Sequence, residues 1–169
     1  VIAITFYSAL LQRGQTEVID SLIFELQKNY NCLPIYAKSF KDKKNAELTT
    51  YLLQEYSPIS LINLTGFSLK EERLSNTTIF DSGERLVFQG VLSSMSEHEW
   101  SHSSKGMNDR DIIMAISLPE IDGRIITKTI AFKEKIKFDS ITQTDLVEYH
   151  PNIFGIKYWS TSFTGEKNT

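Results

Sequence analysis

The sequence has a single cysteine, Cys32, so an internal disulfide bond is excluded. Cys32 begins an apolar stretch, and we expect it to lie in the core, because a reactive thiol needs an electropositive and partly exposed site. No apolar run approaches the roughly 20 residues of a membrane-spanning helix, and no signal peptide is recognisable. We therefore expect a cytoplasmic protein without a membrane span.

Patterns that bind phosphate groups or nucleic acids are also missing. The chain contains neither Gly-x-Gly-x-x-Gly nor Gly-Lys-Ser/Thr, so no dinucleotide site or phosphate-binding loop is indicated. The net charge is −3 and no basic face is indicated, which gives no reason to expect a nucleic acid partner. The 169 residues are 41% hydrophobic and 23% charged, a composition typical of one folded globular domain with a substantial core.

What the chain does contain is an alternation of strand and helix patterns. A β-branched and aromatic run at residues 1–7 is typical of a strand covered on both faces. Two further strands are predicted at residues 33–37 and 59–64, and apolar positions at helical spacing occupy residues 16–26 and 46–56. Right-handed crossovers turn this order into an α/β fold, a mainly parallel sheet flanked by helices, with flavodoxin-like or Rossmann-like architecture.

The second half of the chain predicts an antiparallel extension of that sheet. Residues 86–92 form a fourth predicted strand that carries Gln89 in an apolar setting. A buried amide must find hydrogen-bond partners, so Gln89 either fixes a neighbouring loop or reaches a ligand. The apolar run at residues 112–118 is interpreted as a strand, and we expect it to pair with residues 124–133 in an antiparallel hairpin.

The connection between those two predicted strands, Leu118-Pro-Glu-Ile-Asp-Gly-Arg124, holds two carboxylates in a short and stiff loop. Pro119 fixes its own φ, and Asp122-Gly123 is a strong turn dipeptide. A stiff loop that presents Glu120 and Asp122 beside a buried strand is a candidate for chemistry. An ordinary hairpin corner has the same composition, so this alternative stays open.

A second candidate site follows from the topology. In open parallel sheets, ligands bind outside the carboxyl ends of the strands. Polar residues and a glycine follow the predicted strands there, and Asn63, Thr65 and Gly66 are candidate substrate contacts, together with Gln89. The composition alone favours a simpler interpretation, in which these residues cap helices and fill turns.

A metal-binding pattern occurs in a predicted helix that starts with a capping box at Ser96 and Glu99. The sequence His98-Glu-Trp-Ser-His102 matches the His-Glu-x-x-His pattern of zinc peptidases, with both imidazoles on one helical face. The helix is short, and Lys105 stands where a metzincin continuation requires glycine. We therefore favour an exposed helix with two surface histidines, and we predict no metal site.

Several short segments of the first 133 residues occur in a specific order and spacing. They are Phe6-Tyr7, Gly14-Gln-Thr16, Ile19-Asp-Ser-Leu-Ile23, Leu33-Pro34, Ser39-Phe-Lys-Asp42, Asn63-Leu-Thr-Gly-Phe67, Phe88-Gln-Gly-Val-Leu92 and Leu118-Pro-Glu-Ile-Asp-Gly-Arg124. Together they resemble the large subunit of the cobaltochelatase and magnesium-chelatase family, the CobN type in particular. The Asp-Gly-Arg-Ile ending is more similar to the cobalt branch than to the magnesium branch.

The resemblance implies a piece of a very large, multidomain subunit that binds a tetrapyrrole and receives a metal ion, cobalt rather than magnesium. It also implies partner subunits of the AAA+ type that hydrolyse ATP with magnesium, so no cofactor is expected in this chain. Metal insertion requires that two pyrrole protons be removed and that a divalent ion be delivered, and carboxylates serve both needs. Glu120 is the first candidate for this role and Asp122 the second. Alternatively, Asp122 only shapes the turn, and Glu120 pairs with Arg110 or Arg124.

We expect residues 1–138 to form the α/β domain of a chelatase large subunit. Residues 139–169 carry no resemblance and are expected to be a tail or the start of the next segment. The chain opens inside a strand pattern, so we expect an excised piece that is inactive alone and contacts the remaining domains of the same subunit. The alternative is a noncatalytic flavodoxin-like module that binds a small ligand or a partner protein at its strand ends.

Overall fold

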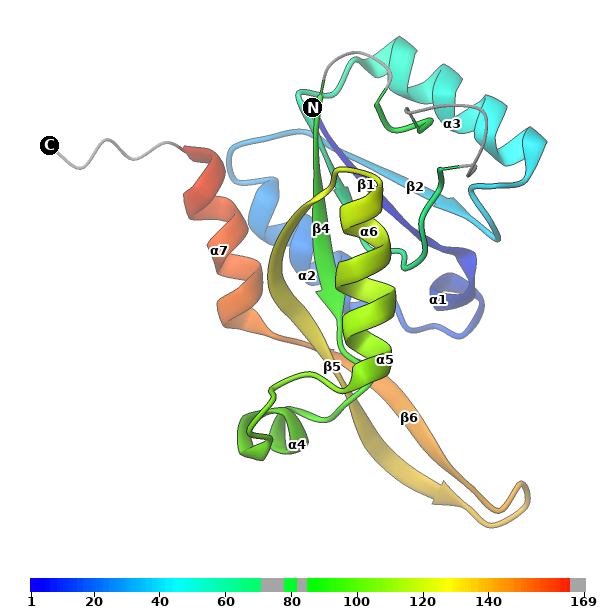
Figure 1. Ribbon diagram of the computed structural model, residues 1–169, viewed down its shortest axis with the longest axis vertical. Coiled ribbons are helices and arrows are strands. Elements are labelled where there is room, and N and C mark those ends of the chain that lie inside the picture. Colours follow the sequence, from blue (N-terminus) through cyan, green and yellow to red (C-terminus); the bar gives the residue numbers. More distant parts are fainter. Residues whose placement is uncertain (71–77, 82–84, 165–169) are drawn as a thin grey trace, which may run out of the picture.

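The computed structural model describes residues 1–70, 78–81 and 85–164, which fold around a six-stranded sheet (Figure 1). The strands are β1 (Ile2–Tyr7), β2 (Cys32–Ala37), β3 (Ser60–Asn63), β4 (Leu86–Leu92), β5 (Ile125–Asp139) and β6 (Thr144–Pro151). The helical segments are α1 (Ser8–Gln12), α2 (Glu17–Leu26), α3 (Lys43–Tyr56), α4 (Glu97–His102), α5 (Asp109–Ile112), the π-helical η1 (Ile113–Ser117), α6 (Leu118–Ile121) and α7 (Ile153–Thr164). Among the described residues, no helix combines the length and the hydropathy that a membrane crossing needs.

The strand order is β2-β1-β3-β4-β5-β6, with parallel pairing through β5 and antiparallel pairing between β5 and β6. The predicted α/β fold, a mainly parallel sheet with an antiparallel extension, is therefore confirmed. The order of the first five strands is the one found in flavodoxin-like sheets, in which the connections reverse direction between β1 and β3. Ligands of such sheets bind at that switch point, outside the carboxyl ends of the strands.

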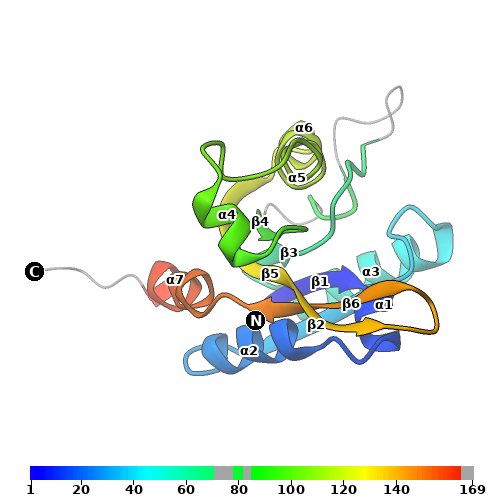
Figure 2. The same ribbon diagram turned by 90° about the horizontal axis from the view of Figure 1, so that it is seen from below.

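Helices cover both faces of the sheet, as Figure 2 shows. Helices α2 and α7 lie on one face, and α3 lies on the other face together with the run from α5 to α6. From β1, Ile2, Ile4 and Phe6 join the core cluster of α2 and α7, whereas Ala3 joins the cluster of α3. Because β1 is an internal strand, both sets of its side chains are removed from water, which explains its continuous apolar sequence.

The segment predicted as a strand at residues 112–118 is helical, so this prediction and the antiparallel pairing with residues 124–133 are wrong. The run from α5 through η1 to α6 begins where the Asn108 side chain accepts a hydrogen bond from Asp111 N at 2.8 Å. A short apolar run does not distinguish a buried strand from a helix. The π-helical turn directly precedes α6 and Pro119, whose ring and missing N–H are incompatible with a regular helix interior. Strand β5 pairs instead with β4, in parallel.

The segment beyond residue 138 takes part in the same sheet and core. Strand β5 runs across the expected boundary, and β6 pairs with it in a long hairpin that projects from the body (Figure 1). In α7, Trp159 is 1% exposed and contacts Phe88 edge to face, with 5.4 Å between the ring centroids. Gly155 allows α7 to approach the sheet, because a Cβ there would lie 2.1 Å from Thr129 O.

Replacing Trp159 by alanine is expected to lower the free energy of unfolding by about 3–5 kcal/mol, the usual cost of removing a buried aromatic side chain. Phe154→Ala is the matched control, because Phe154 lies on the same helix and is 87% exposed. It should change the free energy of unfolding by less than about 0.5 kcal/mol. Urea unfolding followed by far-UV circular dichroism measures both. Equal effects of the two substitutions would contradict the placement of α7 in the core.

Candidate functional site

A buried polar network connects three neighbouring strands at the point where β3 ends. Thr5, Asn63 and Gln89 are register partners on β1, β3 and β4, and all three are almost fully buried. The Asn63 amide donates to Thr65 O at 2.8 Å and to Gln89 Oε1 at 2.7 Å. Its Oδ1 accepts from the hydroxyl groups of Thr5 and Thr65, both at 2.8 Å. Every hydrogen-bonding position of the Asn63 side chain is thus used.

The network converges on the carbonyl oxygen of Thr65. This oxygen accepts from Asn63 Nδ2 at 2.8 Å and from Gln89 Nε2 at 3.1 Å. Arg124 Nη1 is a third and more distant donor, at 3.5 Å. Together these donors fix the loop that follows β3 relative to β4 and β5. The structure therefore brings together three of the predicted substrate contacts, although their polar groups bond largely to one another.

An ion pair between Asp122 and Arg124 extends the network, and both side chains are 1% exposed. Arg124 Nη2 lies 2.6 Å from Asp122 Oδ2, and Nη1 donates to Gln89 Oε1 at 3.0 Å. The guanidinium also lies over the ring of Phe80. Burial lowers the pKa of Arg124, and the charge of Asp122 opposes that shift. A buried charge pair depends on such additional hydrogen bonds, because both ions have lost their hydration.

The Asp122 carboxylate is occupied by the loop that follows β3. It accepts hydrogen bonds from Leu69 N at 2.7 Å, from Lys70 N at 3.1 Å and from the Ser68 hydroxyl, in addition to the Arg124 contact. Four donors match the about four lone-pair positions of a carboxylate. Asp122 therefore anchors this loop, and its oxygens have no position left for a metal ion.

Glu120, the other predicted catalytic acid, lies in a different environment. It is exposed on α6 and lines neither of the two cavities at the strand ends. Its carboxylate forms no ion pair with any described residue, and Arg124, one of its expected partners, pairs with Asp122 instead. The structure does not bring the two acids to one site, and their catalytic roles stay predictions.

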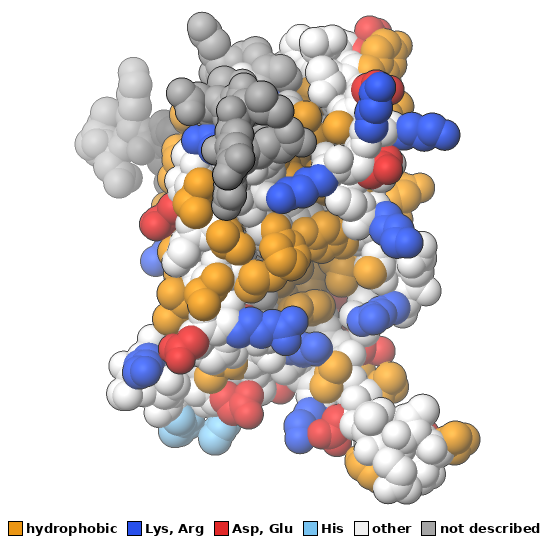
Figure 3. Space-filling view, turned by 45° about the vertical axis from the view of Figure 1, so that its right-hand side comes forward, with side chains coloured by type: hydrophobic (Ala, Val, Ile, Leu, Met, Phe, Trp, Pro, Cys, Tyr) orange, Lys and Arg blue, Asp and Glu red, His pale blue; other side chains and the backbone are white. Residues whose placement is uncertain are grey.

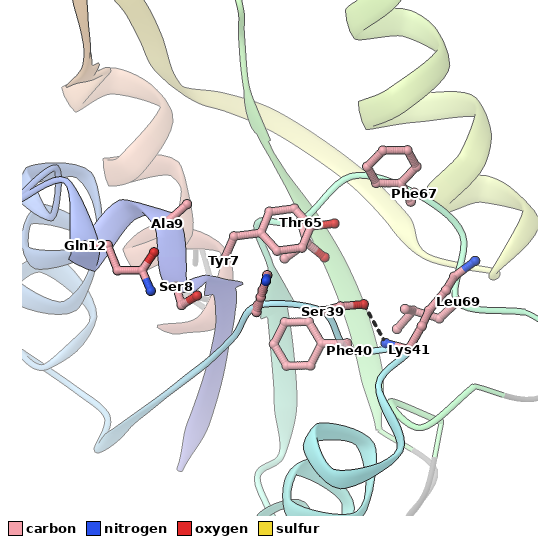
Figure 4. A pocket seen from close by; sticks show the side chains of 11 residues that line it. Tyr7, Ser8, Ala9, Gln12, Ser39, Phe40, Lys41, Thr65, Phe67 and Leu69 are labelled. Atoms are coloured by element: carbon pink, nitrogen blue, oxygen red, sulfur yellow. Dashed lines mark hydrogen bonds between the residues drawn. The ribbon is translucent and has the colours of Figure 1, made fainter.

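The first cavity, of about 590 Å³, opens where β1, β2 and β3 end, at the switch point of the sheet (Figure 4). Its lining residues are Tyr7, Ser8, Ala9, Gln12, Lys38, Ser39, Phe40, Lys41, Thr65, Phe67 and Leu69. The Tyr7 hydroxyl donates to Gly66 O at 3.1 Å, and burial raises the pKa of Tyr7. Aromatic rings and two exposed lysines give the cavity an apolar interior and a positively charged rim.

The second cavity, of about 300 Å³, shares Tyr7, Ala9 and Phe67 with the first and extends to β4 and to the helical run of α5 and η1. Gly66 and Gln89, two predicted substrate contacts, line it. A Cβ on Gly66 would lie 3.0 Å from the carbonyl oxygen of Met114, so glycine here permits the close approach of the helix. On this side of the molecule, Figure 3 shows a hollow lined by hydrophobic side chains and bordered by Lys and Arg.

The two histidines of the zinc-peptidase pattern stack on each other on α4, with 4.2 Å between their ring centroids. Both are exposed, and His102 Nδ1 lies 2.9 Å from the carbonyl oxygen of His98. In the described part of the chain, no group of three or more His, Cys, Asp and Glu side chains is arranged to hold a metal ion. The predicted capping box of Ser96 and Glu99 is confirmed.

The sequence patterns do not predict the roles of Arg124 and Tyr7. A signal for Arg124 exists, because an arginine that begins an apolar strand two residues after an acid is a candidate for a buried pair. For Tyr7 there is no such signal, because an aromatic residue at a strand end is equally typical of the core.

Comparison with known proteins gives consistent matches. A family model described as CobN/Magnesium Chelatase matches residues 1–157. The chain is 30% identical over 152 residues to the aerobic cobaltochelatase subunit CobN of Sinorhizobium sp., and 29% identical over 150 residues to the protein of the same name from Pseudomonas aeruginosa. These matches cover 89% and 88% of this chain but 12% of each relative. The catalytic subunit of cobaltochelatase from Mycobacterium tuberculosis has a similar fold, with a TM-score of 0.72 at 17% identity, over 94% of this chain and 14% of that one.

The geometry predicts that substituting Asp122 costs much more stability than substituting the neighbouring Glu120. Asp122→Asn should lower the free energy of unfolding by about 3–5 kcal/mol, because it leaves the buried Arg124 without its counter-charge. Glu120→Gln is the matched control on the same turn, and it should change the free energy of unfolding by less than about 0.5 kcal/mol. Urea unfolding followed by circular dichroism measures both. A stable Asp122→Asn variant would show that the ion pair does not hold the loop.

Proposed function

Because this chain belongs to the CobN/magnesium chelatase family, we propose that it is part of the tetrapyrrole-binding large subunit of an ATP-dependent metal chelatase. The family resemblance predicted from the sequence is confirmed by the match over residues 1–157. We propose that the reaction inserts cobalt, rather than magnesium, into a corrin precursor or a porphyrin, since two relatives are cobaltochelatase subunits by name. The chain spans about one eighth of these relatives, so the complete reaction is assigned to a larger assembly.

The observation that carries the proposal is the pair of adjoining cavities at the switch point of the sheet. Their volumes of about 590 and 300 Å³ are in the usual range for small-molecule sites. The lining combines aromatic and aliphatic side chains with cations from several elements. A tetrapyrrole is a largely apolar ring with acidic side chains, so this combination matches it in polarity and charge.

The two predicted acids, Glu120 and Asp122, differ in what they contribute to metal insertion. Insertion replaces two pyrrole N–H protons by one divalent ion, so a base must accept the protons. The Glu120 carboxylate has no ion pair with a described residue and is available. The oxygens of the Asp122 carboxylate are occupied by hydrogen bonds and by the ion pair with Arg124. We therefore assign proton acceptance or ion delivery to Glu120, facing a surface completed by other domains. Asp122 positions the loop that lines the first cavity.

The energy for insertion is assigned to other subunits. The sequence has no phosphate-binding loop, and we propose that AAA+ partners hydrolyse ATP in the presence of magnesium. The metal ion to be inserted is a substrate of the assembly. We also propose a cytoplasmic location, where ATP is available to these partners.

A second candidate is a noncatalytic flavodoxin-like module that binds a small ligand at the same cavities. The flavodoxin strand order and the position of the first cavity at the switch point favour it. The two proposals differ in the ligand that they require. The chelatase assignment requires a tetrapyrrole, whereas the module does not.

Titration of the chain with a porphyrin distinguishes them. Binding should shift the Soret absorbance and quench the fluorescence of Trp100 and Trp159. Phe67→Ala should weaken binding about tenfold, or ~1.4 kcal/mol, because Phe67 lines both cavities. Phe154→Ala is the control, since Phe154 is exposed on α7 and lines neither. Absence of porphyrin binding by the unmodified chain would reject the role of these cavities as a tetrapyrrole site.

A second test concerns the catalytic acid in the full-length subunit. Glu120→Gln should lower kcat for metal insertion by about 10²–10⁴-fold with little change in KM, as expected for loss of a proton acceptor. Glu55→Gln, an exposed carboxylate on α3, is the control for a change of one charge. Normal insertion by Glu120→Gln would remove Glu120 from the mechanism.

A further inference from the structure

Three cationic side chains from three different elements line the second cavity. Arg13 follows α1, Arg110 lies on α5 and Lys133 lies on β5. None of them forms an ion pair with a described residue. Uncompensated cations that converge on a cavity are a site for an anion, because they repel one another until a negative charge is bound.

Tyr149 of β6 places a hydroxyl group among these cations. It is the direct register partner of Lys133 on β5, so the two side chains lie on the same face of the hairpin. Burial raises the pKa of Tyr149, the charge of Asp111 adds to this shift, and the charges of Arg110 and Arg13 oppose it. The phenol is therefore a neutral hydrogen-bond donor close to both arginines.

Asp111 is the one carboxylate among the described residues that line the second cavity, and it bonds to neighbouring parts of the chain. Its Oδ2 accepts from Ser93 Oγ at 2.9 Å and from Ser94 N at 2.7 Å. The side chain is buried, with the residue 5% exposed. One carboxylate with these partners does not neutralise three cations, so the cavity keeps a positive charge.

The floor of the cavity is apolar. It is formed by Leu10, Leu64, Leu92, Met114 and Ala115. Gln89 also lines the cavity, but its amide bonds to Asn63, Arg124 and backbone carbonyl groups. Gln89 therefore shapes the floor and is not the group that recognises a ligand.

From this arrangement we infer that the second cavity is a carboxylate subsite. It binds an acidic side chain of the macrocycle through Arg110, Lys133 and the Tyr149 hydroxyl, with Arg13 at the rim, while the ring edge lies on the apolar floor. The inference rests on the proposed function, because the macrocycle supplies the carboxylate. It makes these residues determinants of specificity, since a free carboxylate is bound and the neutral amide of the same side chain is disfavoured.

The test compares two ligands with the same ring, coproporphyrin with its four carboxylates and the corresponding tetraamide. Their binding to the chain is followed by Soret absorbance. Arg110→Gln and Lys133→Gln should each weaken coproporphyrin binding about tenfold and leave tetraamide binding within about twofold. Lys137→Gln is the matched control, because Lys137 lies on the same strand and lines neither cavity at the strand ends. Circular dichroism confirms that each variant is folded.

The outcomes separate this inference from the proposed function. If both ligands bind and the cavity variants behave like Lys137→Gln, the tetrapyrrole assignment stands and the carboxylate subsite is rejected. If the unmodified chain binds the tetraamide as tightly as coproporphyrin, the subsite is likewise rejected. If neither ligand binds, both the tetrapyrrole role of these cavities and the subsite are rejected. The subsite is supported if the unmodified chain binds coproporphyrin more tightly than the tetraamide, and if Arg110→Gln and Lys133→Gln abolish this preference while Lys137→Gln retains it.

Discussion

The hydrogen bonds that converge on the Thr65 carbonyl oxygen hold together the parts of the chain that form the two cavities. The donors come from the end of β3, from the middle of β4 and from Arg124, the residue before β5. Asp122 then fixes the next residues of the same loop through their backbone N–H groups. This loop supplies residues to both cavities, so the shape of the site depends on buried polar groups that a ligand does not need to touch. An unpaired polar group in the core is costly, and of this network Arg124 Nε is the one buried side-chain atom that lacks a hydrogen-bond partner among the described residues.

The need to pair buried polar groups also gives Asp122 and Glu120 different roles. Arg124 and the loop amides occupy Asp122, which makes its charge part of the fold. Glu120 lies two residues earlier, on the exposed side of α6, where its charge faces solvent. The cations of the second cavity show the reverse case, since the fold brings them together without compensating them. Removing one partner of a buried charge pair destabilises the domain, whereas charge that is left unpaired at a cavity is available for recognition.

Much of the fold was predictable, because the first three strands are short runs separated by segments with helical spacing, and right-handed crossovers then give a parallel sheet. The run at residues 112–118 was not, since its composition suits a strand and a helix equally and only its tertiary contacts decide. Topology placed Asn63 and Thr65 at the carboxyl end of the third strand, and Gln89 was predicted to need hydrogen-bond partners; the structure joins all three in one network. The spacing of Asp122 and Arg124 is a local signal for their ion pair, but the loop whose N–H groups complete the Asp122 contacts is distant in sequence, and no local pattern reports it. The basic lining of the second cavity comes from three segments far apart in sequence, so it was equally inaccessible.

The position of Arg124 at the start of β5 also has a consequence for how the site forms during folding. The bonds that define the site join residues separated by 26, 35 and 59 positions along the chain. Closing such loops costs entropy, which the contacts that they bring together must offset. Within the first three strands the network already contains the Thr5–Asn63 bond, whereas the bonds from Gln89 and Arg124 to the loop after β3 require β4 and the segment that leads into β5. A nascent chain that ends before Arg124 therefore contains most of the lining residues of both cavities and still lacks the site.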